Sequence, residues 1–249
     1  MEHQPQIQAI TVRQVPALNG YKWITQGLRL FRLNPVMWII LLVLYLLIMI
    51  PVSLIPVLGS VASTLLAPVF AAGMMWGCQA LNRNQDLEIN HLFQGFKQNT
   101  SQLITVGGLY MLSLLMIAVL TVLMLDKEAV EVLAQGKDLS PEQASAVLFP
   151  LLTALFLIVP VLMAYWFAPV LAGLHQINAV DAMKLSFIAC FKNMLPFLLY
   201  GVALTLILAV VLWLLINVST FLAVIFLMLI PVMMTSLYAS YADVFGIEV

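Results

Sequence analysis

The stretch that decides the fold is KWITQGLRLFRLNP, which runs from Lys22 to Pro35. On a helical wheel its basic residues and Gln26 fall on one side, and its apolar residues and Gly27 fall on the other, which is typical of a basic amphipathic helix. Pro35 ends this helix, and an uncharged run of membrane-spanning length begins directly after it. This order predicts an interfacial helix that leads into a transmembrane helix.

The composition predicts a polytopic membrane protein. Of the 249 residues 63% are hydrophobic and only 8% are charged, which lies far outside the usage of soluble domains. The net charge is −1 and the basic residues form no run, so the sequence gives no support for nucleic-acid binding. The first twenty residues lack an apolar core region, so no cleavable signal peptide is expected. Two cysteines are too few for a disulfide framework.

Six stretches are long enough to span the membrane, because crossing about 30 Å of hydrocarbon takes about 20 apolar residues. None of them contains Asp, Glu, Lys or Arg. They are Val36–Val57, Ser60–Leu81, Leu103–Leu125, Val147–Gly173, Leu195–Ile216 and Phe221–Tyr241. Turn residues at Pro56–Gly59 and Asn217–Thr220 predict that the first and the last pairs form hairpins. The fourth span is overlong and contains three prolines, so its boundary is the least certain.

The basic residues predict that both termini are cytoplasmic. All but two of the ten Lys and Arg residues fall in segments on one side of the predicted spans. The other two, Lys127 and Lys137, lie in the acidic loop 126–146 on the opposite side. Because short cytoplasmic loops carry the excess of Lys and Arg, this loop should be external. Within it, Ser140-Pro141 is a helix start.

Short words recur along the chain and predict an internal repeat. One is the Phe-basic-Asn word, which contains Phe31 and Asn34, Phe96 and Asn99, and, with one residue deleted, Phe191 and Asn193. A second word surrounds Pro68 and Pro169 in the returning spans, with a degraded copy at Pro231. The alternative is that six apolar helices share short words by chance. The Phe-basic-Asn word precedes all three odd-numbered spans and no even-numbered one, which favours the repeat.

The fold predicted from these patterns is an all-α integral membrane bundle. Six transmembrane helices form three tandem hairpins, and a cytoplasmic interfacial amphipathic helix precedes each hairpin. Every unit has an even number of spans, so the copies share one orientation and define a pseudo-three-fold parallel repeat. We expect a polar tail at 1–19, a membrane domain at 20–241 with repeat units at roughly 20–81, 87–173 and 178–241, and a C-terminal tail at 242–249.

The chain resembles the uncharacterised six-helix inner-membrane proteins of proteobacteria that are described only as transmembrane proteins. More distantly it is similar to the membrane domain found beside some glycerophosphodiester phosphodiesterases. The words that carry the resemblance are Trp23–Pro35, His91–Phe96, the stretch from Phe167, and Ala182–Asn193. It implies a Gram-negative inner-membrane location, and it supplies no catalytic residue, ligand or partner.

The sequence contains no constellation that predicts an enzyme, a cofactor or a metal site. No nucleophile–base pair, zinc-protease motif, phosphate-binding loop or paired acids occur. His91, His175, Cys78 and Cys190 could in principle bind zinc, but nothing in their spacing resembles a ligand pair. The fourteen methionines are scattered, and methionine is an ordinary filler of apolar cores.

Three further features have both a structural and a functional interpretation. Gly73 and Gly77 permit close helix packing, which is more often intramolecular than a homodimer seam. Pro68, Pro169 and Pro231 either shape the bundle or line a central cavity. The cytoplasmic cations form a collar that could bind anionic head groups, although the positive-inside rule alone produces such a collar. Its members are Lys22, Arg29, Arg32, Lys97, Lys184 and Lys192.

The leading hypothesis is a non-enzymatic inner-membrane protein that organises or supports the envelope through contacts with lipid or other membrane proteins. The alternative is an uncoupled carrier or channel for a small apolar or amphipathic solute or lipid. Coupled transporters usually keep a charged group at mid-membrane, and these spans contain none. A polar cavity lined by Tyr45, Thr153 and Thr205 would favour the carrier, and a dry axis would contradict it. The sequence predicts no oligomeric state.

Overall fold

The computed structural model describes residues 10–136, 138, 140–218 and 223–247, and every regular element in those residues is helical. Six helices are long and apolar enough to cross a membrane. The elements are α1 (Asn19–Leu33), α2 (Pro35–Ser53), α3 (Leu58–Asn82), α4 (Ile89–Leu92), η1 (Gln94–Phe96), α5 (Thr100–Met124), α6 (Lys127–Ala134), α7 (Pro141–Trp166), α8 (Ala168–Leu174), α9 (Ala179–Lys192), α10 (Met194–Asn217) and α11 (Ala223–Phe245).

The helix starts follow from local capping chemistry. Asn34 precedes α2, its Oδ1 accepts the Met37 backbone N–H at 3.2 Å, and Pro35 occupies the first turn. At α7, Ser140 and Gln143 form a reciprocal capping box, with bonds of 3.2 and 3.1 Å. The predicted helix start at Ser140-Pro141 is therefore confirmed. The turn predicted at Asn217–Thr220 includes residues 219 and 220, which lie outside the described residues.

The fourth predicted span is two helices rather than one kinked helix. α7 ends at Trp166 and α8 begins at Ala168, so Pro169 lies in the first turn of a new helix, where no N–H is needed. Ser186 of α9 satisfies both broken ends, because its Oγ accepts the Phe167 N–H at 2.8 Å and donates to the Met163 carbonyl at 2.7 Å. Pro68 and Pro231, by contrast, lie inside continuous helices.

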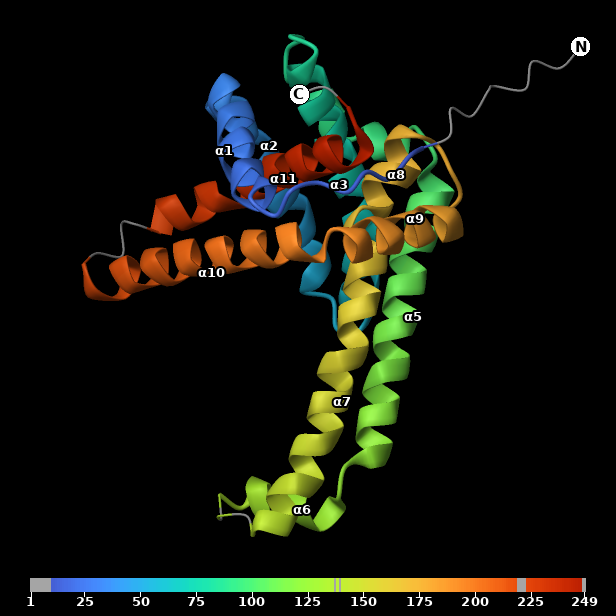
Figure 1. Ribbon diagram of the computed structural model, residues 1–249, viewed down its shortest axis with the longest axis vertical. Coiled ribbons are helices and arrows are strands. Elements are labelled where there is room, and N and C mark those ends of the chain that lie inside the picture. The colour runs from blue at the N-terminus through green and yellow to red at the C-terminus, as the bar shows by residue number, and fades with distance from the viewer. Residues whose placement is uncertain (1–9, 137, 139, 219–222, 248–249) are drawn as a thin grey trace, which may run out of the picture.

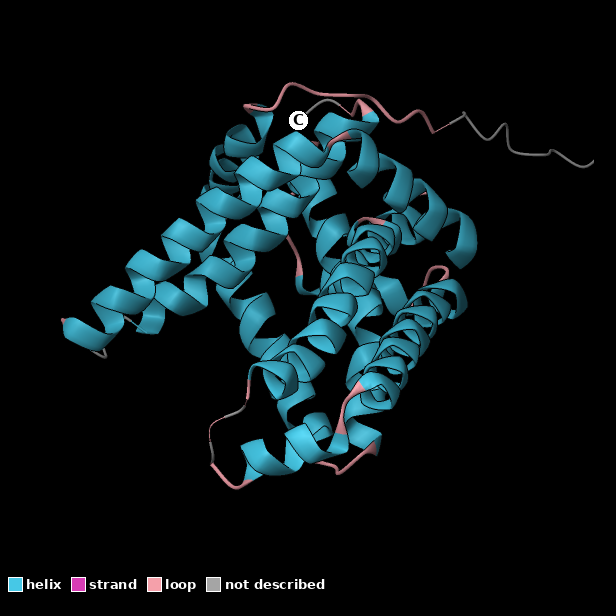
Figure 2. Ribbon diagram, turned by 60° about the horizontal axis from the view of Figure 1, so that its bottom comes forward, coloured by secondary structure: helices cyan, strands magenta, loops and turns pink. Residues whose placement is uncertain are grey.

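The long helices lie in pairs that leave a common centre in different directions. In Figure 1, α10 and α11 extend to the left, whereas α5 and α7 extend downward and end at α6. Figure 2 shows the same divergence after rotation. Much of the surface of α5, α7 and α10 is exposed and apolar, while the buried residues concentrate where α1, α3, α8 and α11 meet. We call this centre the hub; fully buried members include Trp23, Phe167, Ala172, Tyr238 and Tyr241.

Each predicted interfacial segment packs on a long helix that precedes it in the chain or, for the first segment, on the last helix. α4 contacts α3, and α9 contacts α7 and α8. α1, which comes before every hairpin, contacts α11 and α10 far more extensively than it contacts α2. The second predicted interfacial helix is two short helices, α4 and η1, instead of one continuous amphipathic helix. Its Gly95 lies against the Val69 carbonyl of α3, where a larger residue would not fit.

Residues 10–18, part of the predicted polar tail, pack across the hub (Figure 1). The backbone N–H of Arg13 donates to the Val244 carbonyl at 2.8 Å. Ile10, Val12 and Val15 lie against the core. α11 continues four residues beyond the predicted span, to Phe245, and Gly246 at φ 71° ends it. The two ends of the described chain are thus joined at the hub.

Candidate functional site

Three side-chain hydrogen bonds at the hub join α1 to α11. Asp243 Oδ2 accepts the Trp23 Nε1–H at 2.8 Å and the Asn19 Nδ2–H at 2.9 Å. Thr235 Oγ1 donates to the Gly27 carbonyl at 2.8 Å. Asp243 and Thr235 were not predicted as site residues, although polar residues near the end of an apolar span were a visible signal.

The asparagines of the Phe-basic-Asn word have structural roles. Asn99 Nδ2 donates to the carbonyls of Ala172 and Ile177, at 2.7 and 3.0 Å, and so holds the segment that leads into α9. Asn193 accepts from the Val15 N–H and donates to the Arg13 carbonyl, both at 2.9 Å, and so holds the segment that leads into α1. Asn34 instead caps its own helix.

The phenylalanines of the same word do not share an environment. Phe31 is buried in the hub, whereas Phe96 packs against Phe70 with ring centroids 5.1 Å apart and is 40% exposed. Phe191 stacks on Phe187 along α9 and is 60% exposed. The two exposed rings can therefore contact lipid.

The six collar residues are all exposed. They are distributed over α1, the end of η1 and α9. Lys184 makes an ion pair with Asp181 of its own helix, with Nζ and Oδ1 3.9 Å apart. The collar cations are therefore spread over separate elements and are accessible at the surface of the described structure.

The three prolines of the returning spans lie in closely packed surroundings. Pro68 and Pro169 are buried in close-packed helices. Pro231 borders a crevice of about 10 Å³ together with Trp38 and Leu41, which is barely the size of one water molecule. Gly73 and Gly77 are also buried inside the chain, because both face α4 and its flanking loop. Their packing is thus intramolecular.

The hydroxyls expected to line a carrier cavity do not converge. Thr153 is half-buried and Thr205 is exposed, and each donates to a carbonyl of its own helix, Phe149 and Gly201 respectively. Tyr45 packs edge-on against Phe70. At the hub, Gly173 lies against Ala72, and Phe167 contacts Tyr241 with ring centroids 6.4 Å apart, so apolar and aromatic side chains pack together at these positions.

Of the four residues considered as zinc ligands, the two histidines have hydrogen-bond partners and the two cysteines are buried. His91 Nδ1 accepts the Glu88 N–H at 2.9 Å as part of a helix cap. His175 Nε2 lies 2.5 Å from the Tyr241 hydroxyl, and burial of this ring edge lowers the pKa of His175. Cys78 and Cys190 are buried and free. Within the described residues, no three His, Cys, Asp or Glu side chains could hold a metal ion together.

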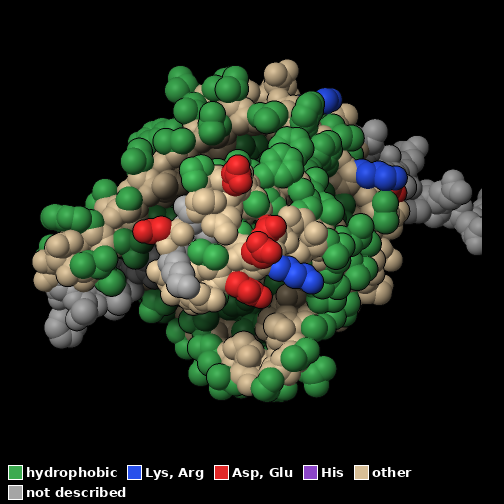
Figure 3. All heavy atoms as spheres, turned by 90° about the horizontal axis from the view of Figure 1, so that it is seen from below, with side chains coloured by type: hydrophobic (Ala, Val, Ile, Leu, Met, Phe, Trp, Pro, Cys, Tyr) green, Lys and Arg blue, Asp and Glu red, His purple; other side chains and the backbone are tan. Residues whose placement is uncertain are grey.

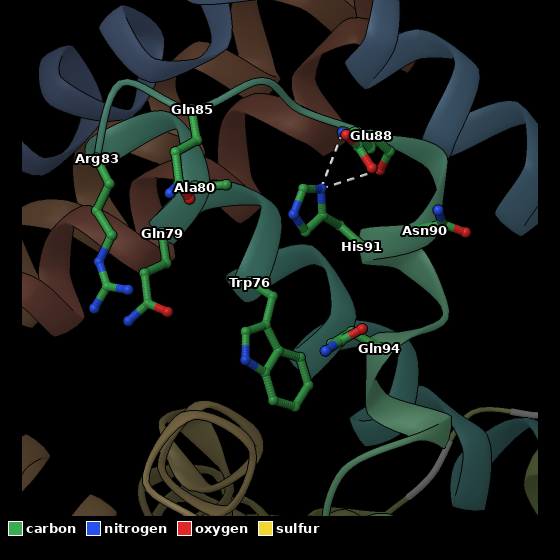
Figure 4. A pocket seen from close by; sticks show the side chains of 9 residues that line it. All are labelled: Trp76, Gln79, Ala80, Arg83, Gln85, Glu88, Asn90, His91 and Gln94. Atoms are coloured by element: carbon green, nitrogen blue, oxygen red, sulfur yellow. Dashed lines mark hydrogen bonds between the residues drawn. The ribbon is translucent and has the colours of Figure 1, made fainter.

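A polar pocket of about 250 Å³ lies where the end of α3 turns into α4. Figure 4 shows His91 and Gln94 on one side of this space, and Trp76 and Gln79 of α3 with Arg83, the residue directly after α3, on the other. Because Nδ1 of His91 accepts a hydrogen bond, Nε2 carries the proton of the neutral ring and is a donor. The pocket offers amides and charges of both signs, which suits hydrogen bonding but supplies no nucleophile–base pair.

Two larger apolar grooves lie beside the hairpins. One, of about 490 Å³, runs between α7 and α10 and is lined by Trp166, Phe197 and Leu204 among others. The other, of about 550 Å³, lies beneath α9 against α5 and α7. Its lining contains one cation, Lys184. These grooves are the sites in the described structure best matched to an apolar ligand.

A comparison with curated proteins finds a probable inner membrane protein of Burkholderia thailandensis that is 34% identical over 196 residues. The alignment covers 76% of this chain and 73% of that protein. No family model matches the chain, and no solved structure matches it.

Proposed function

The chain belongs to the family of this probable inner membrane protein, and we propose that it is a non-enzymatic component that organises or supports the envelope. It does so through contacts with lipid and with other inner-membrane proteins. The observation that carries the proposal is the contrast between a close-packed hub and hairpins whose long apolar sides are exposed. Large exposed apolar faces on a membrane protein are contact surfaces for lipid or for partner helices.

We also propose the three-hairpin repeat, with the interfacial segments lying in the head-group layer. The support is the packing order: each interfacial segment lies on the returning helix of the unit before it, and α1 lies on that of the last unit. Asn99 and Asn193 perform the same task in successive units, which agrees with a common origin. A pseudo-three-fold axis along the membrane normal would follow from this cyclic order.

The proposed orientation places the hub and both termini on the cytoplasmic side. The collar cations lie in α1, η1 and α9, next to the hub, whereas the loop that carries Asp126, Glu128, Glu131 and Glu142 lies at the far end of α5 and α7 (Figure 1). Figure 3 shows acidic side chains gathered on a largely hydrophobic face seen from that end. Labelling single cysteines at Arg29 and at Glu131 from each side of the membrane tests this orientation.

The carrier alternative rests on the two lateral grooves, which could guide an amphipathic molecule along the hairpins. It is less well supported, because the hydroxyls of Thr153 and Thr205, which were expected to line a path, donate to carbonyls of their own helices. A closed hub would block an axial route but not a lateral one.

The test is native mass spectrometry of the protein released gently from its own membranes, with identification of lipids and co-released proteins. We expect one or more inner-membrane proteins to be released reproducibly with the chain. A deletion strain should then show envelope leakage to small dyes. The proposal is overturned if the chain carries no protein partner and instead exchanges a small solute across proteoliposomes at a rate above that of empty vesicles.

A further inference from the structure

We propose that the groove beneath α9 binds a single anionic phospholipid, with one acyl chain in the groove and the phosphate beside Lys184. This inference rests on the proposed function and specifies one of its lipid contacts. The groove is formed by three helices: α5 contributes Leu109 and Ser113, α7 contributes Ala164, and α9 contributes Val180, Met183, Lys184, Phe187 and Ile188.

The chemistry of the groove fits a hydrocarbon chain rather than a polar solute. Its lining is almost entirely apolar, and the hydroxyl of Ser113 already donates to the Leu109 carbonyl at 2.8 Å. No lining hydroxyl is therefore left in need of a partner from the ligand. A volume of about 550 Å³ exceeds what a few water molecules need, and lipid chains are the apolar solvent available at this depth.

α9 itself is built to lie at the boundary between head groups and acyl chains. In Figure 1 it crosses the ends of α5 and α7 that lie nearest the hub. Its outward face carries Val180, Phe187, Ile188 and Phe191, which are 49%, 37%, 42% and 60% exposed. These residues recur at helical spacing, so they form one apolar stripe in contact with the bilayer.

Lys184 supplies the charge complementarity for the head group. It lies within the same stripe and its side chain is 69% exposed, so its ammonium can reach the phosphate layer while its stem covers the groove. Its ion pair with Asp181 spans 3.9 Å and is exposed, and pairs of this kind contribute little. The other carboxylate oxygen of Asp181 accepts from Asn178 Nδ2 at 2.6 Å, so Asp181 stays in place when a phosphate displaces it from Lys184.

The experiment compares variants of the full-length protein by native mass spectrometry in detergent, with phosphatidylglycerol and phosphatidylcholine as probes. For Lys184→Gln we expect about a fivefold loss of bound phosphatidylglycerol, the factor that corresponds to one cation near a lipid phosphate. The Lys192→Gln variant is the matched control, since Lys192 is an exposed collar residue on the same helix that does not line the groove. Asp181→Asn should increase binding.

A second variant tests whether the acyl chain lies in the groove, independently of charge. Ala164→Leu fills the groove from α7 and should reduce binding of both lipids, while the melting temperature reports that the fold is intact. The proposal is wrong if both variants bind phosphatidylglycerol as the wild type does, or if Lys192→Gln loses as much as Lys184→Gln. A wild-type protein that keeps its protein partners but binds no phosphatidylglycerol would overturn this inference alone. An intact lipid site without any partner would overturn the envelope role alone.

Discussion

At the scale of single residues, Asp243 is the polar residue that holds the hub together. Its carboxylate accepts hydrogen bonds from Trp23, which is fully buried, and from Asn19. Asp243→Ala would leave the Trp23 indole N–H without an acceptor, and an unsatisfied buried donor costs about 1–3 kcal/mol. We expect a clear fall in the midpoint of thermal unfolding in mild detergent. Asp86→Ala, in an exposed loop, is the control and should change the midpoint little; an equal fall in both would contradict this role.

The lowered pKa of His175 predicts that the free energy of unfolding depends on pH. Burial lowers the pKa of His175 below 6.5, so the unfolded chain takes up a proton at a higher pH than the folded chain does. The contribution of neutral His175 is complete above pH 6.5 and is lost as the pH falls through 6.5 towards the folded-state pKa. Thermal unfolding of the wild type between pH 7.5 and 5.5 should show this loss. In His175→Gln the slope should be smaller, and an unchanged slope would assign the effect to other groups.

At the scale of elements, α1 docks through glycines. A methyl group on Gly27 would lie 2.5–2.7 Å from backbone and side-chain atoms of Ser236 in α11, so Gly27→Ala must push the two helices apart. Overpacking of this kind costs about 1–3 kcal/mol. Gly201→Ala in α10 is the matched control, because nothing lies within 4 Å of the added methyl. We expect only Gly27→Ala to lower the unfolding midpoint and to expose α1 to limited proteolysis. Equal behaviour of the two variants would contradict this docking.

The elements also show which part of the fold could be read from the sequence. The six spans could be predicted because a 20-residue apolar run has few alternatives in a membrane, and all six long helices are present. The buried face of α1 could be predicted too, since Trp23, Gly27 and Phe31 are buried and Lys22 is exposed. The partner of that face could not, because amphipathicity identifies a face without identifying what covers it. Likewise, Pro169 predicted a kink, but the break depends on Ser186, which is distant in sequence.

The candidate site was harder to predict than the fold. The Phe-basic-Asn word contains Asn99 and Asn193, but these residues bind backbone carbonyls in segments far along the chain, which no local pattern specifies. The collar cations could be named from topology, yet only the arrangement of α5, α7 and α9 distinguishes Lys184 from the others by placing a groove beside it.

At the scale of the whole molecule, the contacts close into a ring. α4 packs on α3, α9 packs on α7 and α8, and α1 packs on α11, so the first element of the chain completes the last hairpin. The two ends of the described chain are already adjacent, since the backbone N–H of Arg13 donates to the Val244 carbonyl. In such a ring the position of the chain ends is not essential to the packing.

This closure predicts that a circular permutant will fold. The permutant joins Val249 to Met1 and opens between Asn84 and Gln85, which are exposed between α3 and α4. It keeps α1 and α11 intact and places the new ends between α3 and α4. We expect it to insert in the membrane and to unfold within a few degrees of the wild type. A permutant opened inside α9, between Ser186 and Phe187, cuts this helix and separates Ser186 from the apolar stripe. We expect this second permutant to be degraded. If the first permutant is degraded as well, residues 10–33 dock only when they precede α2, and the ring is not the unit that folds.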